Sequence, residues 1–391
     1  MSPFSATGLA RVHQVLARHV DHGAVPGVVA LIARHGETHV DAIGAVRPDT
    51  IFRIASMTKP VTAVAAMILV EECVLRLDDP VDGLLPELAD RKVLTRPDAQ
   101  LDDTVPARRP ITVRDLLTFR MGTGQLFGSL GASPLAKALT EIGTNGPPRP
   151  SAVPPPAEYL RLLGALPLLY QPGERWMYNT GSDVLGVLVA RASGQSFAAF
   201  LRERLFDPLG MTDTGFSVPV SARDRLPTEY TTDFTTGQSV VYDAPDGDWA
   251  AEPAFPSGAG GLVSTVSDYA AFASMLRGGG VYEGQRILSR PAVELMTTDQ
   301  LTPAQKAVSG LLPGTFDDMG WGFGVAVTTR RTGIARSVGS YGWDGGLGTS
   351  WFNDPAEDLT AILLTQQAWT APSPPAICQD FWTSAYRALA G

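Results

Sequence analysis

Apolar residues in the first part of the chain recur first at helical and then at strand spacing. Between residues 6 and 22 the apolar positions fall three or four apart, which predicts an amphipathic helix. The next run, residues 27–33, is continuously apolar and predicts a buried strand. After it the pattern predicts, in order, a turn at 34–37, a strand over 38–43, a short strand over 50–55 and a helix over 56–73.

The middle of the chain has short helical segments that are separated by proline-rich connectors. These helices are expected over residues 112–119, 156–165, 181–194 and 197–207. In the last quarter, glycines alternate with β-forming residues, which predicts antiparallel strands. A helix is expected before this quarter, over 266–276. The quarter itself is expected to hold strands over 321–327, 348–352 and 359–365 and a final helix over 374–389.

Strand patterns therefore lie at both ends of the sequence, and helical patterns lie between them. The simplest assembly is an α+β fold in which N- and C-terminal strands form one antiparallel sheet flanked by helices. We expect a discontinuous sheet domain from residues 1–75 and 256–391, with residues 76–255 inserted as a mostly helical domain. The active site would lie between the two parts.

Composition and charge exclude several function classes. The 391 residues are 44% hydrophobic and 18% charged, as in ordinary globular proteins. The net charge of -9 disfavours nucleic acids and anionic membranes as partners, because they repel a negative surface. The longest apolar run, residues 61–70, is about half the length of a membrane span. No signal peptide is visible, and only Cys73 and Cys378 are present, so we expect a reduced, cytoplasmic protein.

The histidines are few and lie close together in the sequence. All five occur in the first tenth of the chain, at positions 13, 19, 22, 35 and 39. A Ser-His-Asp triad or a zinc site would have to draw its imidazoles from this small group. This placement disfavours both, and we expect no metal and no cofactor.

Ser56 and Lys59 form the one Ser-x-x-Lys sequence in the chain. Because Pro60 is well tolerated only in the first turn of a helix, the helix is expected to begin close to Ser56. Residues three apart share a helix face, so the Lys59 amine can reach the Ser56 hydroxyl. A buried lysine has a lowered pKa and can accept the serine proton. The alternative interpretation is a plain helix cap at Ser56 with a solvated Lys59.

The segment Ser56-Met-Thr-Lys-Pro60 resembles the nucleophile motif of the serine β-lactamase and penicillin-binding-protein superfamily. More specifically, the chain is similar to the family VIII carboxylesterases, which share the class C β-lactamase fold. The resemblance runs from about residue 10 to 385. Further matching segments are residues 50–56, 111–118, 171–178, 205–211 and 257–262.

The resemblance implies roles for residues outside the Ser-x-x-Lys sequence. Tyr178 is implied as the second catalytic group, with Lys59 favouring its phenolate so that it can exchange a proton with Ser56. The alternative for Tyr178 is a buried core tyrosine. The amides of Ser56 and Gly346 are implied as the oxyanion hole.

Residues 341–346 depart from the β-lactamase pattern. Trp343 stands where β-lactamases carry the lysine of Lys-Thr-Gly, so the usual anchor for a substrate carboxylate is lost. The substrate-binding residues implied here are Tyr341, Trp343, Asp344 and Gly345. Asn179 directly follows the tyrosine, whereas β-lactamases carry asparagine two residues after it, so Asn179 receives no role.

The function implied is a cofactor-free carboxylesterase that cleaves esters of small or medium acyl chains through a Ser56 acyl-enzyme. Lys59 and Tyr178 would move the proton as general base and acid. The expected partner is a small-molecule ester, with no nucleic acid and no membrane, and no oligomeric state is predicted. The alternatives are a β-lactamase or D-amino peptide hydrolase, an acyltransferase, and a catalytically silent binding protein.

Overall fold

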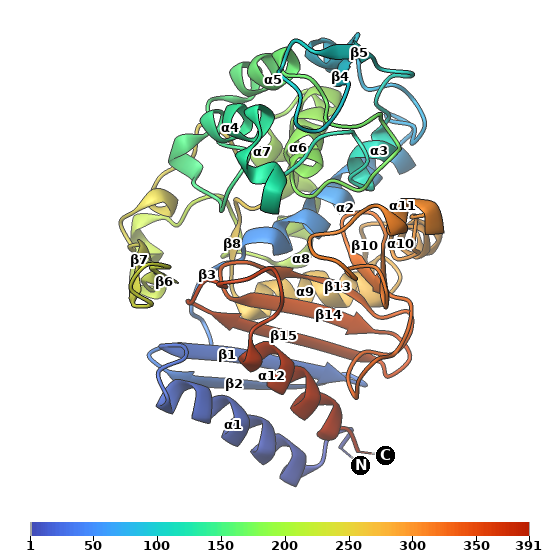
Figure 1. Ribbon diagram of the computed structural model, residues 1–391. Coiled ribbons are helices and arrows are strands. Elements are labelled where there is room, and N and C mark those ends of the chain that lie inside the picture. Colours follow the sequence, from blue (N-terminus) through green and yellow to red (C-terminus); the bar gives the residue numbers. More distant parts are fainter. Residues whose placement is uncertain (1, 391) are drawn as a thin grey trace.

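The computed structural model describes residues 2–390 and joins strands from both ends of the chain in one seven-stranded antiparallel sheet (Figure 1). The strand order is β11-β12-β13-β14-β15-β1-β2. The bounds are β1 Gly27–Arg34, β2 Glu37–Gly44, β11 Met319–Trp321, β12 Ala326–Thr328, β13 Tyr341–Gly345, β14 Thr349–Asp354 and β15 Leu359–Thr365. Because β1 pairs with β15, strands from the N- and C-terminal parts of the chain join in one sheet, which confirms the α+β prediction.

Helices cover both faces of the sheet. Helices α1 (Ala6–Asp21) and α12 (Ala376–Arg387) lie on one face, and α9 (Val266–Arg277) packs on the other, below α2 (Thr58–Glu71) (Figure 1). Strands β14 and β15 are buried along their whole length, and every residue of β1 except the last, Arg34, is buried as well. This burial on both faces explains why these strands are almost continuously apolar instead of alternating.

The inserted region is mostly helical, and small two-stranded sheets lie within it and beside it (Figure 1). Its helices are α3 Val113–Leu117, α4 Pro134–Glu141, α5 Pro156–Ala165, α6 Thr180–Ser193, α7 Phe197–Leu201 and α8 Asp207–Leu209. The paired strands outside the main sheet are β3 Phe52–Arg53 with β8 Val263–Ser264, β4 Lys92–Leu94 with β5 Thr104–Pro106, β6 Glu229–Thr232 with β7 Ser239–Asp243, and β9 Val281–Tyr282 with β10 Gln285–Arg286. Two short helices, α10 Arg290–Met296 and α11 Pro303–Ala307, precede β11.

Helix α2 runs through the junction between the sheet and the helical region. It is buried on nearly every side and packs against α6, which explains its uniformly apolar sequence. The helix ends at Glu71, so Cys73 lies just beyond it and is exposed, not inside the helix as predicted. The first turn of α2, which follows Ser56, is thereby held at the centre of the molecule.

The strand predicted over residues 321–327 is in fact the hairpin of β11 and β12. Gly324 occupies the connecting turn with a left-handed φ of 71°. A Cβ at this position would lie 2.8 Å from the Ala63 Cβ and 2.9 Å from the Lys59 carbonyl oxygen. Only glycine therefore allows this turn to approach α2 so closely.

No single helix within residues 2–390 is both long enough and apolar enough to cross a membrane. Helix α6 and the segment Phe197–Leu209 reach that length only when taken together, and they are bent by 81° relative to each other.

Candidate active site

A tight turn between β3 and α2 presents Ser56. Pairing of β3 with β8 holds the preceding chain, and the Ile54 amide donates to the Leu262 carbonyl at 3.0 Å. Ala55 has a φ of 43°, which is rare for a residue with a side chain and leads into the 3-10 turn Ala55–Met57. Ser56 is partly exposed at the N-terminal end of α2, where the helix dipole favours a negatively charged oxygen.

Lys59 is fully buried beside Ser56, and its amine contacts three oxygen atoms. Nζ lies 2.9 Å from Ser56 Oγ, 2.8 Å from Asn179 Oδ1 and 2.7 Å from the Ala259 carbonyl oxygen. Burial disfavours the charged amine and lowers the pKa of Lys59 to about 7, although the nearby Asp183 opposes this shift. A large fraction of Lys59 is therefore neutral at neutral pH.

The three contacts direct the lone pair of the neutral amine toward the serine. A neutral lysine amine has two N–H donors and one lone pair. Asn179 Oδ1 and the Ala259 carbonyl can only accept hydrogen bonds, so they take the two N–H groups. In the neutral amine the lone pair then faces Ser56 Oγ, 2.9 Å away, and the Ser56 hydroxyl can donate to Nζ. This is the arrangement in which the amine can remove the serine proton.

Asn179 belongs to this site, although its position directly after the tyrosine indicated no role. The Thr180 amide donates to the Tyr178 carbonyl at 3.2 Å, which closes a γ-turn with φ 81° and ψ -70° at Asn179. This rare backbone conformation accompanies the contact between the asparagine amide and Lys59. The signal available in the sequence was the residue type itself, because asparagine tolerates positive φ better than most residues.

Tyr178 lies against both Lys59 and Trp343. The Trp343 indole N–H donates to the Tyr178 hydroxyl oxygen at 2.8 Å, and Lys59 Nζ lies 4.4 Å from the centre of the phenol ring. Burial raises the pKa of Tyr178 to about 12, although hydrogen bonds with Ser56 and Trp343 oppose the shift. The prediction of a phenolate was therefore wrong, because burial outweighs the hydrogen bonds that favour the phenolate. Tyr178 is a proton donor at neutral pH.

Aromatic side chains pack around Tyr178. Trp176 stacks on its ring at a centroid distance of 5.6 Å, and Phe119 meets it edge-on at 6.0 Å. Trp321 packs edge-on against Trp343 at 4.7 Å. Such contacts restrict the rotation of the rings they involve. The phenol and the indole are thus held in fixed positions beside Ser56.

The end of β13 lies close to the nucleophile turn, the turn Ala55–Met57 that carries Ser56. A Cβ at Gly345 would collide with the Ile54 carbonyl oxygen and with Thr349 Oγ1, so glycine is required for this contact. The Thr349 hydroxyl donates to the Ile54 carbonyl at 3.1 Å and ties the two segments together. Gly346 follows at once, and its amide makes no hydrogen bond within residues 2–390. The amide proposed for the oxyanion hole is thus free to bind a ligand.

Two predicted substrate-binding residues lie elsewhere. Tyr341 is buried in the core, and its hydroxyl accepts a hydrogen bond from Asn353 Nδ2 at 3.2 Å. Asp344 accepts a hydrogen bond from Ser350 Oγ at 2.6 Å and faces α12, on the side of the sheet opposite Trp343. The prediction was wrong for both. Strand alternation alone would have separated Asp344 from Trp343, because neighbouring residues in a strand point to opposite faces.

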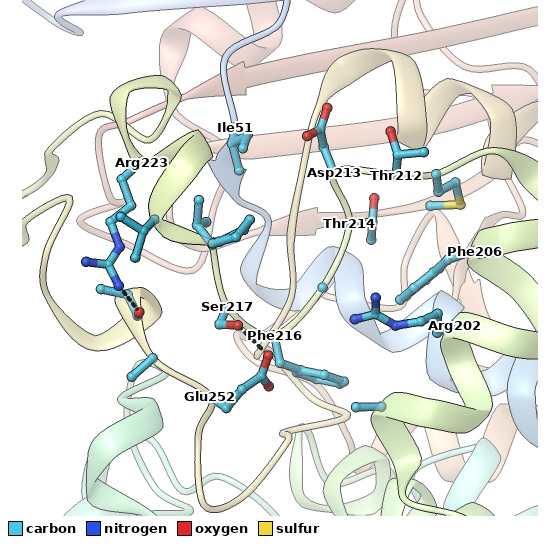
Figure 2. Close-up of a pocket in the computed structure, with 18 of the residues that line it drawn as sticks. Ile51, Arg202, Phe206, Thr212, Asp213, Thr214, Phe216, Ser217, Arg223 and Glu252 are labelled. Atoms are coloured by element: carbon cyan, nitrogen blue, oxygen red, sulfur yellow. Dashed lines mark hydrogen bonds between the residues drawn. The ribbon is translucent and has the colours of Figure 1, made fainter.

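A cavity of about 670 Å³ lies elsewhere in the molecule (Figure 2). None of the residues that contact Lys59 lines it. Two of its charged groups have partners within the protein: Glu252 accepts a hydrogen bond from Ser217 at 2.6 Å, and Arg223 donates to the Ala250 carbonyl at 2.6 Å (Figure 2). Within residues 2–390, no three His, Cys, Asp or Glu side chains are grouped so that they could hold a metal ion.

Comparison with known proteins identifies the family of the chain. The family model described as Beta-lactamase matches residues 12–376. The chain belongs to the Beta-lactamase family. Within this family it is close to esterases: esterase EstB of Burkholderia gladioli is 31% identical, with 95% of this chain and 93% of that protein covered.

Two other similar proteins extend the comparison. An uncharacterized protein of Mycobacterium tuberculosis is 36% identical, with 95% of this chain and 90% of the relative covered. Among solved structures, EstCE1, described as a hydrolase with promiscuous acyltransferase activity, superposes with a TM-score of 0.80 and 25% identity. It covers 97% of this chain and 98% of its own. The chain is therefore a serine hydrolase or acyltransferase of the β-lactamase fold.

Proposed function

We propose that this protein is a carboxylesterase that cleaves esters of small or medium acyl chains through an acyl-enzyme on Ser56. The observation that carries the proposal is the contact of 2.9 Å between Lys59 Nζ and Ser56 Oγ. The other two contacts of the amine are to acceptors, so its lone pair is directed at the serine hydroxyl.

The chemistry follows from these positions. Lys59 takes the proton of Ser56 as the serine oxygen attacks the ester carbonyl, and the Ser56 and Gly346 amides bind the oxyanion that forms. Tyr178, a phenol at neutral pH, donates its proton to the leaving alkoxide and becomes a phenolate beside the protonated Lys59. In the second half of the reaction the phenolate takes a proton from the water that attacks the acyl-enzyme. The protonated Lys59 returns its proton to Ser56 Oγ as the acid is released.

Trp343 favours esters over β-lactams as substrates. Its indole donates to Tyr178, and it offers no positive charge to the carboxylate that a penicillin carries. EstB, which is similar over 95% of this chain, is itself named an esterase. Both points support ester hydrolysis as the main reaction.

Acyl transfer to an alcohol is the second candidate. EstCE1, which has the same fold and 25% identity, is described as a hydrolase with promiscuous acyltransferase activity. The acyl-enzyme is common to both reactions, and only the acceptor differs. An alcohol that occupies the position of the hydrolytic water would give transfer instead of hydrolysis.

The test is hydrolysis of p-nitrophenyl acetate, butyrate and octanoate by the wild type, Ser56→Ala and the control Ser217→Ala, with nitrocefin assayed alongside. We expect turnover of the shorter esters by the wild type and the control, none by Ser56→Ala, and little nitrocefin cleavage. If Ser56→Ala hydrolysed the esters as fast as the wild type, Ser56 could not be the nucleophile. Ester production that exceeds hydrolysis when an alcohol is added would favour the transferase.

A further inference from the structure

A buried carboxylate, Asp183, lies next to the loop of residues 257–260, which contacts Lys59 through the Ala259 carbonyl. Asp183 lies in the first turn of α6, and only 6% of its surface is exposed. Its Oδ1 accepts hydrogen bonds from Ser257 Oγ at 2.6 Å and from the Ala259 amide at 3.1 Å. Ala259 also presents the carbonyl oxygen that lies 2.7 Å from Lys59 Nζ. One residue thus connects the Asp183 carboxylate to the active-site amine.

The loop packs between α2 and α6. Ser257 Oγ accepts from the Gly260 amide at 3.1 Å, which holds the turn closed. Thr62 of α2 donates to the Gly258 carbonyl at 2.7 Å, and a Cβ at Gly258 would collide with the Ser182 carbonyl oxygen of α6. The loop therefore has little freedom, and Asp183 is the charged group that anchors it.

The charge of Asp183 also acts on Lys59. Lys59 on α2 and Tyr159 on α5 lie near Asp183, and Tyr178 contacts Lys59. Burial raises the pKa of Asp183 itself, whereas its hydrogen bonds with Ser257 and Ala259 and the charge of Lys59 lower it and so favour the carboxylate. Burial raises the pKa of both tyrosines, so they are neutral, and Asp344, which influences Tyr178, lies beyond the sheet. The carboxylate opposes the effect of burial on the pKa of Lys59, because a negative charge stabilises the protonated amine.

We propose that Asp183 is a positioning residue with two effects on the active site. Through Ser257 and Ala259 it holds a carbonyl acceptor against Lys59, and its negative charge sets the pH at which Lys59 becomes a base. This inference rests on the proposed function, in which Lys59 removes the proton of Ser56. It extends that function to a residue that contacts no reacting atom.

The test is the pH dependence of Ser56 labelling by a fluorophosphonate probe, which needs no ester substrate. Asp183→Asn keeps an acceptor oxygen for both donors but removes the charge, so the acid limb of the labelling profile should move to lower pH by about one unit. Asp268→Asn is the matched control. Asp268 is also a buried carboxylate that accepts one amide, from Asp213, and one hydroxyl, from Thr214. Its profile should coincide with that of the wild type.

A second variant separates charge from geometry. Ser257→Ala removes one anchor of the loop but leaves the carboxylate, so the plateau of labelling should fall without a shift of the acid limb to lower pH. Should Asp183→Asn fail to fold, Asp183→Ser removes the same charge with a smaller side chain, and the same shift is expected.

Three outcomes would overturn the proposal: an acid limb of Asp183→Asn at the wild-type pH, an equal shift in Asp268→Asn, or the same shift in Ser257→Ala. Failure of the proposed function has a different signature. In that case the wild type would hydrolyse no ester, or the probe would not label Ser56 at any pH.

Discussion

The Lys59 amine joins three segments that are far apart in the sequence, and its protonation state governs Ser56. Because burial lowers its pKa to about 7, the neutral base is lost as the pH falls below that value. We expect kcat/KM for p-nitrophenyl butyrate to fall about tenfold per pH unit below about pH 7 and to level off above it. Lys59→Arg, which stays protonated, should lose about 100-fold or more at every pH. A flat profile in the wild type would contradict the role of Lys59 as base.

Asn179 combines an unusual backbone conformation with a contact to Lys59, and the two can be separated. Asn179→Gly removes the acceptor but suits the φ of 81°. Loss of one hydrogen bond to a buried amine corresponds to a decrease of about 10- to 100-fold in kcat/KM. The melting temperature should change little, because relief of backbone strain offsets the added freedom of glycine in the unfolded chain. Activity within twofold of the wild type would show that the amide oxygen is dispensable.

The indole N–H of Trp343 is expected to orient Tyr178. Trp343→Phe keeps an aromatic ring but removes the donor that lies 2.8 Å from the phenol oxygen, and kcat should fall about tenfold. Trp321→Phe is the matched control, because the Trp321 Nε1 has no hydrogen-bond partner within residues 2–390. If both variants lose activity equally, ring packing and not the hydrogen bond explains the loss.

At the scale of elements, the approach of β13 to the nucleophile turn determines the geometry of the site. Gly345→Ala introduces a Cβ that collides with the Ile54 carbonyl oxygen, so the strand must move away from Ser56. We expect kcat/KM to fall by more than about tenfold, with a loss of about 1–3 kcal/mol in the free energy of unfolding. Gly333→Ala, where an added Cβ meets nothing within 4 Å, serves as the control. Full activity in Gly345→Ala would show that β13 can shift without effect on the site.

Local sequence patterns predicted most elements near their observed bounds. The strand β1 and helices α5 and α9 follow directly from runs of apolar residues or from helical spacing. The hairpin of β11 and β12 did not follow, because its turn depends on the contact of Gly324 with Ala63, more than 200 residues away. A pattern that is read over ten residues contains no information about such a contact.

At the scale of the whole molecule, the site could be predicted only in part for the same reason. Ser56 and Lys59 are three residues apart, so helix geometry alone places them together. Tyr178 and Gly346 came from the family resemblance. Asn179 and Asp183 reach the site through the packing of α6 and its preceding turn against α2, which only the assembled fold reveals.

The two chain ends meet on the face of the sheet opposite Ser56, so stability and activity can be separated there. The Ser5 amide donates to the Ala388 carbonyl at 2.9 Å, and a Cβ at Gly8 would lie 2.5 Å from the Ala388 Cα. Gly8→Val must push α1 away from α12, which costs about 1–3 kcal/mol and lowers the melting temperature by a few degrees. Ala10→Val places the same side chain at an exposed position of the same helix and should cost much less.

Both variants should keep the wild-type kcat/KM at 25 °C, because the sheet stands between α1 and the residues that contact Lys59. The measurements are thermal unfolding by circular dichroism and ester hydrolysis on the same samples. If Gly8→Val lowered kcat/KM while the protein was still folded, a displacement of α1 would have to reach Ser56 through β1, β15 and β14. The sheet would then transmit strain to the site, and the separation of stability from activity would not hold.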